Sequence, residues 1–251
     1  MNREEQLLKK RILDLANLCC RRDIPSYTDF LNLNEQTVFH SLERSLPPVR
    51  FMLTGGYEPA ERKIVCFLPS YEEETMEPPI RILEVKPVSP RFAEALTHRD
   101  YLGALLNLGV DRAMIGDILV QEKAAWFFCN KKMTDFFLKN LCRVRHTNIL
   151  ITVVDKQAEL PAPKTETIHG TCASVRLDSL IALAFKASRS SMVSYIEGGQ
   201  VFVNGKLITS NGYEPREGDI ISVRGKGRFI YDGTSHQTRK GRSSIQLSLY
   251  I

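Results

Sequence analysis

The pattern of hydrophobic and polar positions predicts two helices at the start of the chain. From residue 2 to residue 22, apolar side chains recur every three or four positions with charged residues between them, as in an amphipathic helix. Pro25 ends this pattern. Asn34 can cap a second helix that runs to Arg44, because its side-chain oxygen can accept a hydrogen bond from a free backbone N–H group.

Two strands are predicted next, at 49–54 and 63–68. Gly55-Gly56 lies between them and is typical of a turn. Residues 70–79 are polar, contain Glu72-Glu73-Glu74 and end in two prolines. This composition predicts a solvated domain junction rather than a metal site.

Strand and helix patterns alternate in the middle of the chain. Thr97 can cap the first helix of this region, and Gly109 can end it. The order β-α-β-β-α-β is that of the ferredoxin-like plan, which some RNA-recognition domains share. The predicted strands are 80–88, 114–120, 124–129 and 148–154, and the predicted helices are 98–108 and 131–141.

The third of these strands lacks the basic-glycine-aromatic signature of RNA-recognition domains. Trp126, Phe127 and Phe128 are consecutive, so they alternate between the two faces of the sheet and do not form one stacking platform. We therefore expect core packing for these rings. In the following helix, we expect one apolar face made of Met133, Phe136, Phe137 and Leu141.

The last third of the chain predicts two short helices followed by a small β-sheet. Leu177, Leu180 and Ile181 lie on one face of the first helix, and Ser188 can cap a second helix from 189 to 197. Asn204-Gly205 is a strong signal for a hairpin turn. The predicted strands are 201–203, 206–208, 220–224 and 245–250.

These patterns predict an α+β protein with three domains. They are an N-terminal helical and β-hairpin region at 1–75, a ferredoxin-like middle domain at 76–160 and a small αα-β domain at 170–251. Residues 158–164, with two prolines, are predicted to link the last two domains.

The charge distribution points to a polyanion as the partner of the C-terminal domain. Residues 162–251 hold 12 Lys and Arg against 7 Asp and Glu, whereas residues 1–161 hold 22 of each, so the whole net charge of +5 lies in the C-terminal part. Free N–H groups at a helix start also favour phosphate. Candidate RNA contacts are Arg176, Lys186, Ser188, Arg189, Ser190, Lys206, Arg224, Lys226 and Arg228, and His98 and Arg99 are candidate secondary phosphate contacts.

The C-terminal segment resembles the S-four RNA-binding domain. The resemblance rests on R-L-D at 176–178, S-R-S at 188–190, I-E-G-G-Q-V-F-V-N-G-K at 196–206 and G-D-I-I-S-V at 218–223. It implies RNA contact through the hairpin that includes Asn204 and through five further residues, Arg176, Ser188, Arg189, Ser190 and Lys206.

The whole chain resembles the YlmH family of bacterial proteins. The matching stretches are L-T-H-R-D-Y-L-G-A-L-L-N-L-G at 96–109 and I-G-D-I at 115–118. With heat-shock protein fifteen as a cousin, the resemblance implies binding to rRNA of the large ribosomal subunit. It further implies recognition of stalled subunits that hold peptidyl-tRNA, with contact to that tRNA, in ribosome-associated quality control.

An RNA-modifying enzyme is the main alternative. Pseudouridine synthases that carry this domain also have an R-L-D motif with a catalytic aspartate, but Asp178 lies at the start of a predicted apolar helix, and the chain holds no second R-L-D. We therefore interpret Asp178 as a helix-start or ion-pair residue and assign no catalytic residue. Two non-catalytic functions also remain open, namely a binder of free tRNA or of an rRNA precursor, and a pure protein-interaction module.

Cofactors, metals and membranes are not expected. The six cysteines have no C-x-x-C pair and no histidine at zinc-ligand spacing, so we expect reduced, mostly buried thiols and neither a metal nor a cofactor. No apolar run approaches the length needed to cross a bilayer, and no apolar signal core follows Met1. We expect a cytoplasmic protein, and nothing in the sequence demands more than a monomer.

Overall fold

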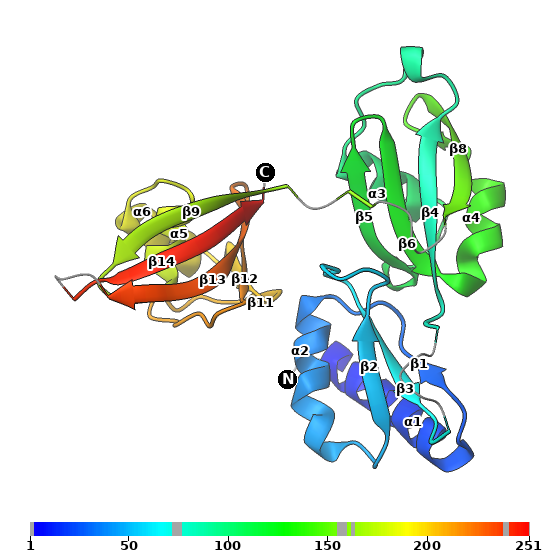
Figure 1. Cartoon of the computed structure of the whole chain (residues 1–251), viewed down its shortest axis with the longest axis horizontal. Helices are drawn as coiled ribbons and strands as arrows, with labels where there is room; N and C mark the ends of the chain where they lie inside the picture. Colours follow the sequence, from blue (N-terminus) through cyan, green and yellow to red (C-terminus); the bar gives the residue numbers. More distant parts are fainter. Residues whose placement is uncertain (1–2, 72–76, 155–159, 162–163, 238–240, 251) are drawn as a thin grey trace. The chain divides into compact units, whose positions relative to one another are not determined.

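The computed structural model describes residues 3–71, 77–154, 160–161, 164–237 and 241–250. Helices and strands are mixed, and the chain forms two compact units, residues 1–161 and 162–251 (Figure 1). The predicted linkers around Glu72-Glu73-Glu74 and around 158–164 fall largely outside the described residues. Our division of the first unit into two domains stays a prediction.

The first unit begins with two helices packed on a three-stranded antiparallel sheet of order β1-β3-β2. Ile12 and Ala16 of the first helix are buried against Phe39 and Phe67. The strands at 49–54 and 63–68 and the first helix lie where the sequence predicts them. The elements are α1 (Arg3–Arg22), β1 (Ser26–Tyr27), α2 (Leu33–Leu42), the 3-10 helix η1 (Glu43–Ser45), β2 (Arg50–Thr54) and β3 (Ile64–Leu68).

The cap of the second helix differs from the prediction. Asn32, not Asn34, precedes α2, and its Oδ1 accepts a hydrogen bond from the Glu35 backbone N–H at 3.0 Å. Glu35 Oε2 accepts the Asn32 N–H at 2.7 Å, which completes a reciprocal capping box. Asn34 lies inside the helix. The signal was present in the sequence, because a glutamate follows Asn32 at the third position.

A five-stranded antiparallel sheet of order β5-β6-β4-β8-β7 completes the first unit. Two helices interrupt its strands along the chain, so the predicted order of strands and helices is observed. The elements are β4 (Ile80–Pro87), η2 (Pro90–Phe92), α3 (His98–Asn107), η3 (Arg112–Met114), β5 (Ile115–Gln121), β6 (Ala124–Asn130), η4 (Lys131–Met133), α4 (Thr134–Asn140), β7 (Arg143–Val144) and β8 (Thr147–Val154).

The second helix of this region is shorter than predicted. Its first turn is the 3-10 helix η4, which Asn130 caps by accepting the Lys132 N–H at 3.2 Å. Phe137 is fully buried, but the Phe136 side chain is 36% exposed, so the expected apolar face is narrower. The two-residue strand β7 was not predicted, because two residues carry no readable periodicity.

The two faces of the five-stranded sheet pack against different parts of the unit. Phe127 lies in the core cluster that also contains Tyr101 of α3 and Phe137 of α4. Phe128 points the other way and belongs to a second cluster with Phe30 and Ile64 of the N-terminal part. The alternation of the aromatic residues in β6 is therefore observed, and both phenylalanines are core residues as expected.

The N-terminal part and the sheet approach each other closely at Gly116. A Cβ atom on this glycine would lie 2.7 Å from Phe30 Cε1 and 2.8 Å from Phe128 Cβ, which leaves no room for a side chain. Tyr57 stacks on Phe128 with ring centroids 4.7 Å apart and planes 16° apart. The N-terminal part therefore closes one end of the sheet's second face.

Asp117 ties the same junction together through hydrogen bonds. Its Oδ2 accepts the Tyr57 hydroxyl at 2.8 Å and the Glu61 N–H at 2.7 Å, and its Oδ1 accepts the Arg62 N–H at 3.0 Å. The Arg62 side chain donates to the Ile115 carbonyl at 3.1 Å. Burial lowers the pKa of Arg62. These contacts join residues more than fifty positions apart in the sequence, so no local pattern predicts them.

The second unit is a six-stranded antiparallel sheet of order β11-β10-β12-β13-β14-β9 with two helices on one face (Figure 1). Strands β9 and β13 were not predicted, whereas both helices and the remaining strands were. The elements are β9 (Thr165–Cys172), α5 (Leu177–Ala184), α6 (Arg189–Glu197), β10 (Val201–Val203), β11 (Lys206–Leu207), β12 (Ile220–Val223), β13 (Gly227–Gln237) and β14 (Ser243–Tyr250).

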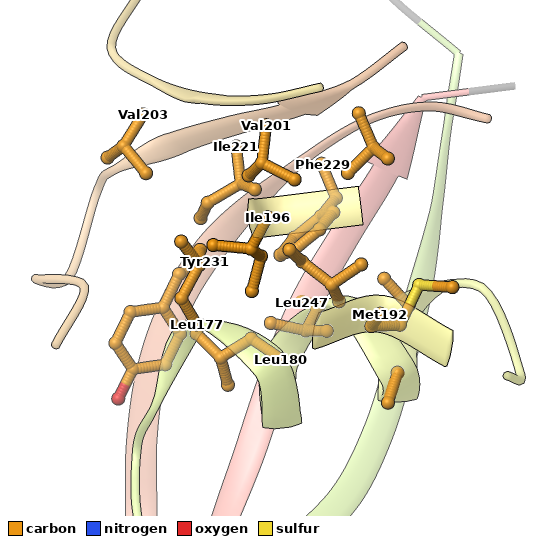
Figure 2. Packing of buried hydrophobic residues seen from close by; sticks show 14 of the residues in the cluster. Leu177, Leu180, Met192, Ile196, Val201, Val203, Ile221, Phe229, Tyr231 and Leu247 are labelled. Carbon is orange, nitrogen blue, oxygen red and sulfur yellow. The ribbon is translucent and has the colours of Figure 1, made fainter. Parts of the chain in front are cut away.

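Apolar side chains between the helices and the sheet form the core of this unit. Figure 2 shows Leu177 and Leu180 of α5 and Met192 of α6 in this cluster with Phe229 and Leu247 of the sheet, and all five are almost wholly buried. Along β10, β12 and β13, buried residues alternate with half-exposed ones. Within this unit the helices therefore cover one face of the sheet, and the other face keeps accessible side chains.

Candidate nucleic-acid interface

A buried aspartate holds two candidate RNA-binding arginines together. Asp178 is the second residue of α5 and is only 3% exposed. Its Oδ2 accepts hydrogen bonds from Arg189 Nη2 at 2.7 Å and from Arg189 Nε at 3.1 Å. Arg176 Nε lies 3.3 Å from Oδ1 on the other side. The ion-pair interpretation of Asp178 is the one that the structure shows, and the pair fixes the starts of α5 and α6 against each other.

The start of α6 presents polar groups to solvent. Ser188 caps the helix, with its Oγ accepting the Ser191 N–H at 3.2 Å, as predicted. Ser190 Oγ lies 3.2 Å from Ser188 Oγ. Ser188, Arg189, Ser190 and the nearby Lys186 are all exposed. A phosphate group at this helix start would meet free N–H groups, hydroxyl donors and the Arg189 guanidinium together.

A second group of cations surrounds the turn between β12 and β13, and each lies over an aromatic ring. Arg224 is 5.2 Å from the centre of the Phe202 ring, and Lys226 is 5.1 Å from the centre of the Tyr195 ring. Arg228 is 4.3 Å from the centre of the Tyr250 ring. Attraction between a cation and the ring face restricts these long side chains without neutralising their charge. They remain able to attract an anionic backbone.

The hairpin between β10 and β11 is built around Asn204. Both turn residues have positive φ, 48° at Asn204 and 73° at Gly205, as the N-G signal predicts. Asn204 Nδ2 donates to Asp219 Oδ1 at 2.7 Å, and its Oδ1 accepts the Ile220 N–H at 2.9 Å. The side chain of Asn204 is therefore occupied within the protein. Lys206, next in the hairpin, is exposed.

The structure thus sorts the predicted site residues into groups. Arg176 and Arg189 meet at Asp178, and Arg224, Lys226 and Arg228 gather at one end of the sheet. His98 and Arg99, the candidate secondary contacts, are exposed in the other unit.

Sequence reasoning missed the aromatic partners of these cations. Phe202 lies opposite Ser222 in the sheet, and Ser222 lies opposite Arg228, so one row across three strands combines an aromatic ring and a guanidinium. The alternation of V-F-V at 201–203 could have placed Phe202 on the outer face. The ring of Tyr250 meets Arg228 only through the pairing of β13 with β14, which the sequence did not reveal.

Membrane-spanning helices and groups of metal ligands are both absent from the described parts of the chain. None of the helices there combines the length and the apolar character needed to cross a membrane. Among the same residues, no three His, Cys, Asp or Glu side chains are grouped in a way that could hold a metal ion.

A domain family matches part of each unit. Residues 75–158 match the family described as "Putative RNA-binding domain in YlmH". Residues 175–221 match the S4 domain, which covers α5, α6 and the hairpin described above. Each unit therefore contains a segment that matches a domain family of RNA-binding proteins, and together these segments define the class of the protein.

Similar proteins carry related descriptions. The "Ribosome-associated protein quality control protein P2" of Bacillus subtilis (strain 168) is 29% identical over 219 residues, which cover 86% of this chain and 83% of that protein. The "Small ribosomal subunit protein uS4" of Thermosipho africanus (strain TCF52B) is 38% identical over 56 residues, 22% of this chain and 27% of that protein. A solved structure, "Cell division protein ylmH from Streptococcus pneumoniae", aligns with a TM-score of 0.49 at 22% identity, over 62% of this chain and 93% of that one.

The resemblance to the YlmH family that the sequence predicts is thereby confirmed. Both RNA-binding domains occur in one chain, and the similarity to the Bacillus subtilis protein extends through most of both sequences.

Proposed function

We propose that this protein is a non-catalytic RNA-binding protein that docks on rRNA and tRNA of the large ribosomal subunit. Its role there is quality control of stalled subunits that carry peptidyl-tRNA. The observation that carries the proposal is the C-terminal site itself, in which exposed serines and fixed cations surround the start of a helix within an S4 domain. The name of the Bacillus subtilis relative supports the ribosomal setting.

The geometry suits docking on structured RNA. Phosphate contacts from arginine, lysine and helix N-termini give affinity and orientation but carry little sequence information. Double-stranded RNA is recognised mainly by its shape, which demands cations at fixed separations. The ion pairs of Asp178 and the cation–ring contacts of Arg224, Lys226 and Arg228 supply such fixed positions.

The state of Asp178 supports a binding role over RNA modification. A catalytic aspartate must reach the reacting base, but this carboxylate is buried and receives both Nε and Nη2 of Arg189. The test of the enzyme alternative is a pseudouridine assay on rRNA and tRNA incubated with the full chain. We expect no conversion above that of the Asp178→Asn variant, and conversion by the parent alone would favour the enzyme.

Binding of free tRNA or of an rRNA precursor is the second alternative. The exposed cations do not distinguish these RNAs from assembled subunits, because phosphates are common to all of them. We propose the subunit because of the name of the relative and infer a cytoplasmic protein that acts as a monomer. We also propose a ferredoxin-like fold for residues 76–160, supported by the antiparallel order β5-β6-β4-β8.

Sucrose-gradient sedimentation of a cell lysate tests the proposal. Fractions are probed for this protein and for tRNA at low salt. We expect the protein in the fractions of free large subunits, together with peptidyl-tRNA. A protein that stays at the top of the gradient contradicts ribosome docking and favours a free RNA substrate. The Lys206→Gln and Arg224→Gln double variant lacks two of the proposed RNA contacts. We expect this variant to remain at the top of the gradient.

A further inference from the structure

We propose that the first unit holds a second RNA site, an arginine-lined hollow between α3 and residues 140–145 that takes a backbone phosphate group of RNA. The inference rests on the proposed RNA binding and places a contact for the domain at 75–158. The hollow, called here the arginine hollow, is bounded by residues 99–108, which are α3 and its C-cap Leu108, and by the segment 140–145, and its volume is about 560 Å³. It is an open depression on the surface, with room for a phosphate group.

The sheet of the same unit is a poor alternative for this contact. Bases can stack on aromatic side chains of a sheet face in RNA-recognition domains. Here Phe128 is fully buried, and Tyr57 occupies the position over its ring that a base would need. Ile82, which pairs with Phe128 in the sheet, and Ile80, which pairs with Asn130, are buried against the N-terminal part as well. An RNA contact of this unit is therefore expected on another surface.

The charges around the arginine hollow favour an anion. Arg99, Arg143 and Arg145 line it and are exposed, and they come from three different places, α3, β7 and the turn after β7. Among the described residues that line it, the only carboxylate is that of Asp100. Its Oδ2 accepts the Thr97 N–H at 2.8 Å and the Thr97 hydroxyl at 2.7 Å, so it acts as a helix cap.

Asp100 also helps to position one of the arginines. Arg145 Nη1 lies 3.6 Å from Asp100 Oδ1, and Arg145 Nε lies 3.9 Å from Glu94 Oε2. Arg145 stands in the two-residue turn between β7 and β8, where its φ is 50°. Arg143 Nη2 lies 3.2 Å from His146 Nδ1 in the same turn. The three arginines of the hollow outnumber the two nearby carboxylates, Asp100 and Glu94, so the sum of these charges is positive.

Part of the lining of the hollow is made of small residues. Gly103 and Ala104 face it from α3, and a Cβ atom on Gly103 would meet nothing within 4 Å. A bulky ligand group can therefore come close to the helix. A guanidinium group binds phosphate through two parallel N–H donors, and guanidinium groups on separate elements can grip one phosphate from different sides. The chemistry fits a nucleotide unit of an RNA chain.

RNA binding by full-length variants tests the inference, with purified large-subunit rRNA as the probe. The hollow variant is Arg143→Gln with Arg145→Gln, and the matched control is Arg21→Gln with Arg22→Gln at the exposed end of α1. We expect the hollow variant to lose about tenfold in affinity at moderate salt and its salt slope to fall by about one to two, with the control unchanged. If the hollow variant has a lower melting temperature than the parent, the Arg99→Gln variant on α3 replaces it in the test.

The outcomes separate this inference from the proposed function. If the hollow variant binds like the control while the Lys206→Gln and Arg224→Gln variant binds weakly, the hollow is excluded and the C-terminal site stands. A loss confined to the hollow variant supports the hollow and contradicts the C-terminal site. If the hollow variant keeps full rRNA affinity but loses binding of inorganic phosphate or AMP, the hollow takes free phosphates, and the RNA assignment is wrong.

Discussion

The five-stranded and the six-stranded sheet of this protein differ in what covers their second face. In the five-stranded sheet, α3 and α4 cover one face, and the N-terminal part closes one end of the other, where Tyr57 lies on Phe128. In the six-stranded sheet, α5 and α6 cover one face, and Phe202 and Arg228 remain accessible on the other. Strand order alone therefore does not tell which surface can meet RNA, because a neighbouring segment can occupy it.

The two units also differ in the role that an aspartate carboxylate has in each of them. Asp117 uses its carboxylate to join two parts of the first unit through backbone N–H groups. Asp178 uses its carboxylate to hold two arginines near the surface of the second unit. The first arrangement seals a junction, and the second keeps positive charge in place for a partner.

The largest effect is expected from Asp178→Ala. Asp178 is buried, but the side chains of Arg176 and Arg189 are partly exposed, so water can solvate them when the carboxylate is removed. We therefore expect the second unit to lose about 3 kcal/mol of unfolding free energy, the lower end of the range for a broken buried ion pair. Hydrogen exchange of the α5 and α6 amides should accelerate roughly a hundredfold. Trp126, the single tryptophan, reports on the first unit alone, so its fluorescence transition should not move. Glu197→Ala, an exposed carboxylate on α6, is the control, and equal exchange in both variants would contradict the role of Asp178.

The closure of the first unit is broken by Gly116→Ala. The added methyl group overlaps Phe30 and Phe128, and we expect a loss of about 2 to 3 kcal/mol, measured as a lower urea midpoint of Trp126 fluorescence. Gly103→Ala is the matched control, because its Cβ atom meets nothing. There the better helix propensity of alanine should stabilise the unit by up to about 1 kcal/mol. If both variants shift the midpoint alike, the close packing at Gly116 is not what holds the junction.

A smaller effect is expected from Arg189→Ala on RNA binding. The variant removes a cation at the start of α6 and leaves the Asp178 charge less compensated, so affinity in a filter-binding titration should fall about tenfold. Arg22→Ala in α1 removes the same charge from the other unit and should leave affinity nearly unchanged. Equal affinity of the Arg189 variant and the parent would remove this helix start from the interface.

The smallest effect concerns the reactivity of the cysteine thiols. It distinguishes exposed from buried parts of the protein and needs no substitution. Burial raises the pKa of the Cys66 and Cys129 thiols to about 12 and also raises those of Cys19 and Cys172. Only Cys20 and Cys142 are exposed. A thiol reagent at pH 8 should therefore modify two cysteines of the folded protein rapidly and the other four only after unfolding. Rapid modification of Cys66 would show that the junction opens readily.

Local sequence patterns predicted the elements that local rules govern. The Ser188 cap, the Asn204-Gly205 turn and the apolar face of α5 all depend on residues within one or two turns of each other, and all are observed. Strand β9 was missed because Thr165–Cys172 is mostly polar and exposed, and only its pairing with β14 makes it a strand.

The candidate site was predictable in type but not in arrangement. The sequence located the basic residues of the second unit, but the rings beneath Arg224, Lys226 and Arg228 come from other elements. Arg143 and Arg145 were missed because their hollow forms only when the segment after α4 folds beside α3. Contacts of this kind depend on tertiary packing, which no periodicity encodes.

The salt dependence of RNA binding tests the central claim most directly, namely that fixed cations of the second unit hold RNA by its phosphates. About four phosphate contacts predict a loss of affinity of roughly a hundredfold between about 50 and 200 mM salt. The Arg224→Gln and Lys226→Gln double variant should show a salt slope lower by about one to two. A flat curve for the parent, or equal slopes for parent and variant, would contradict the account.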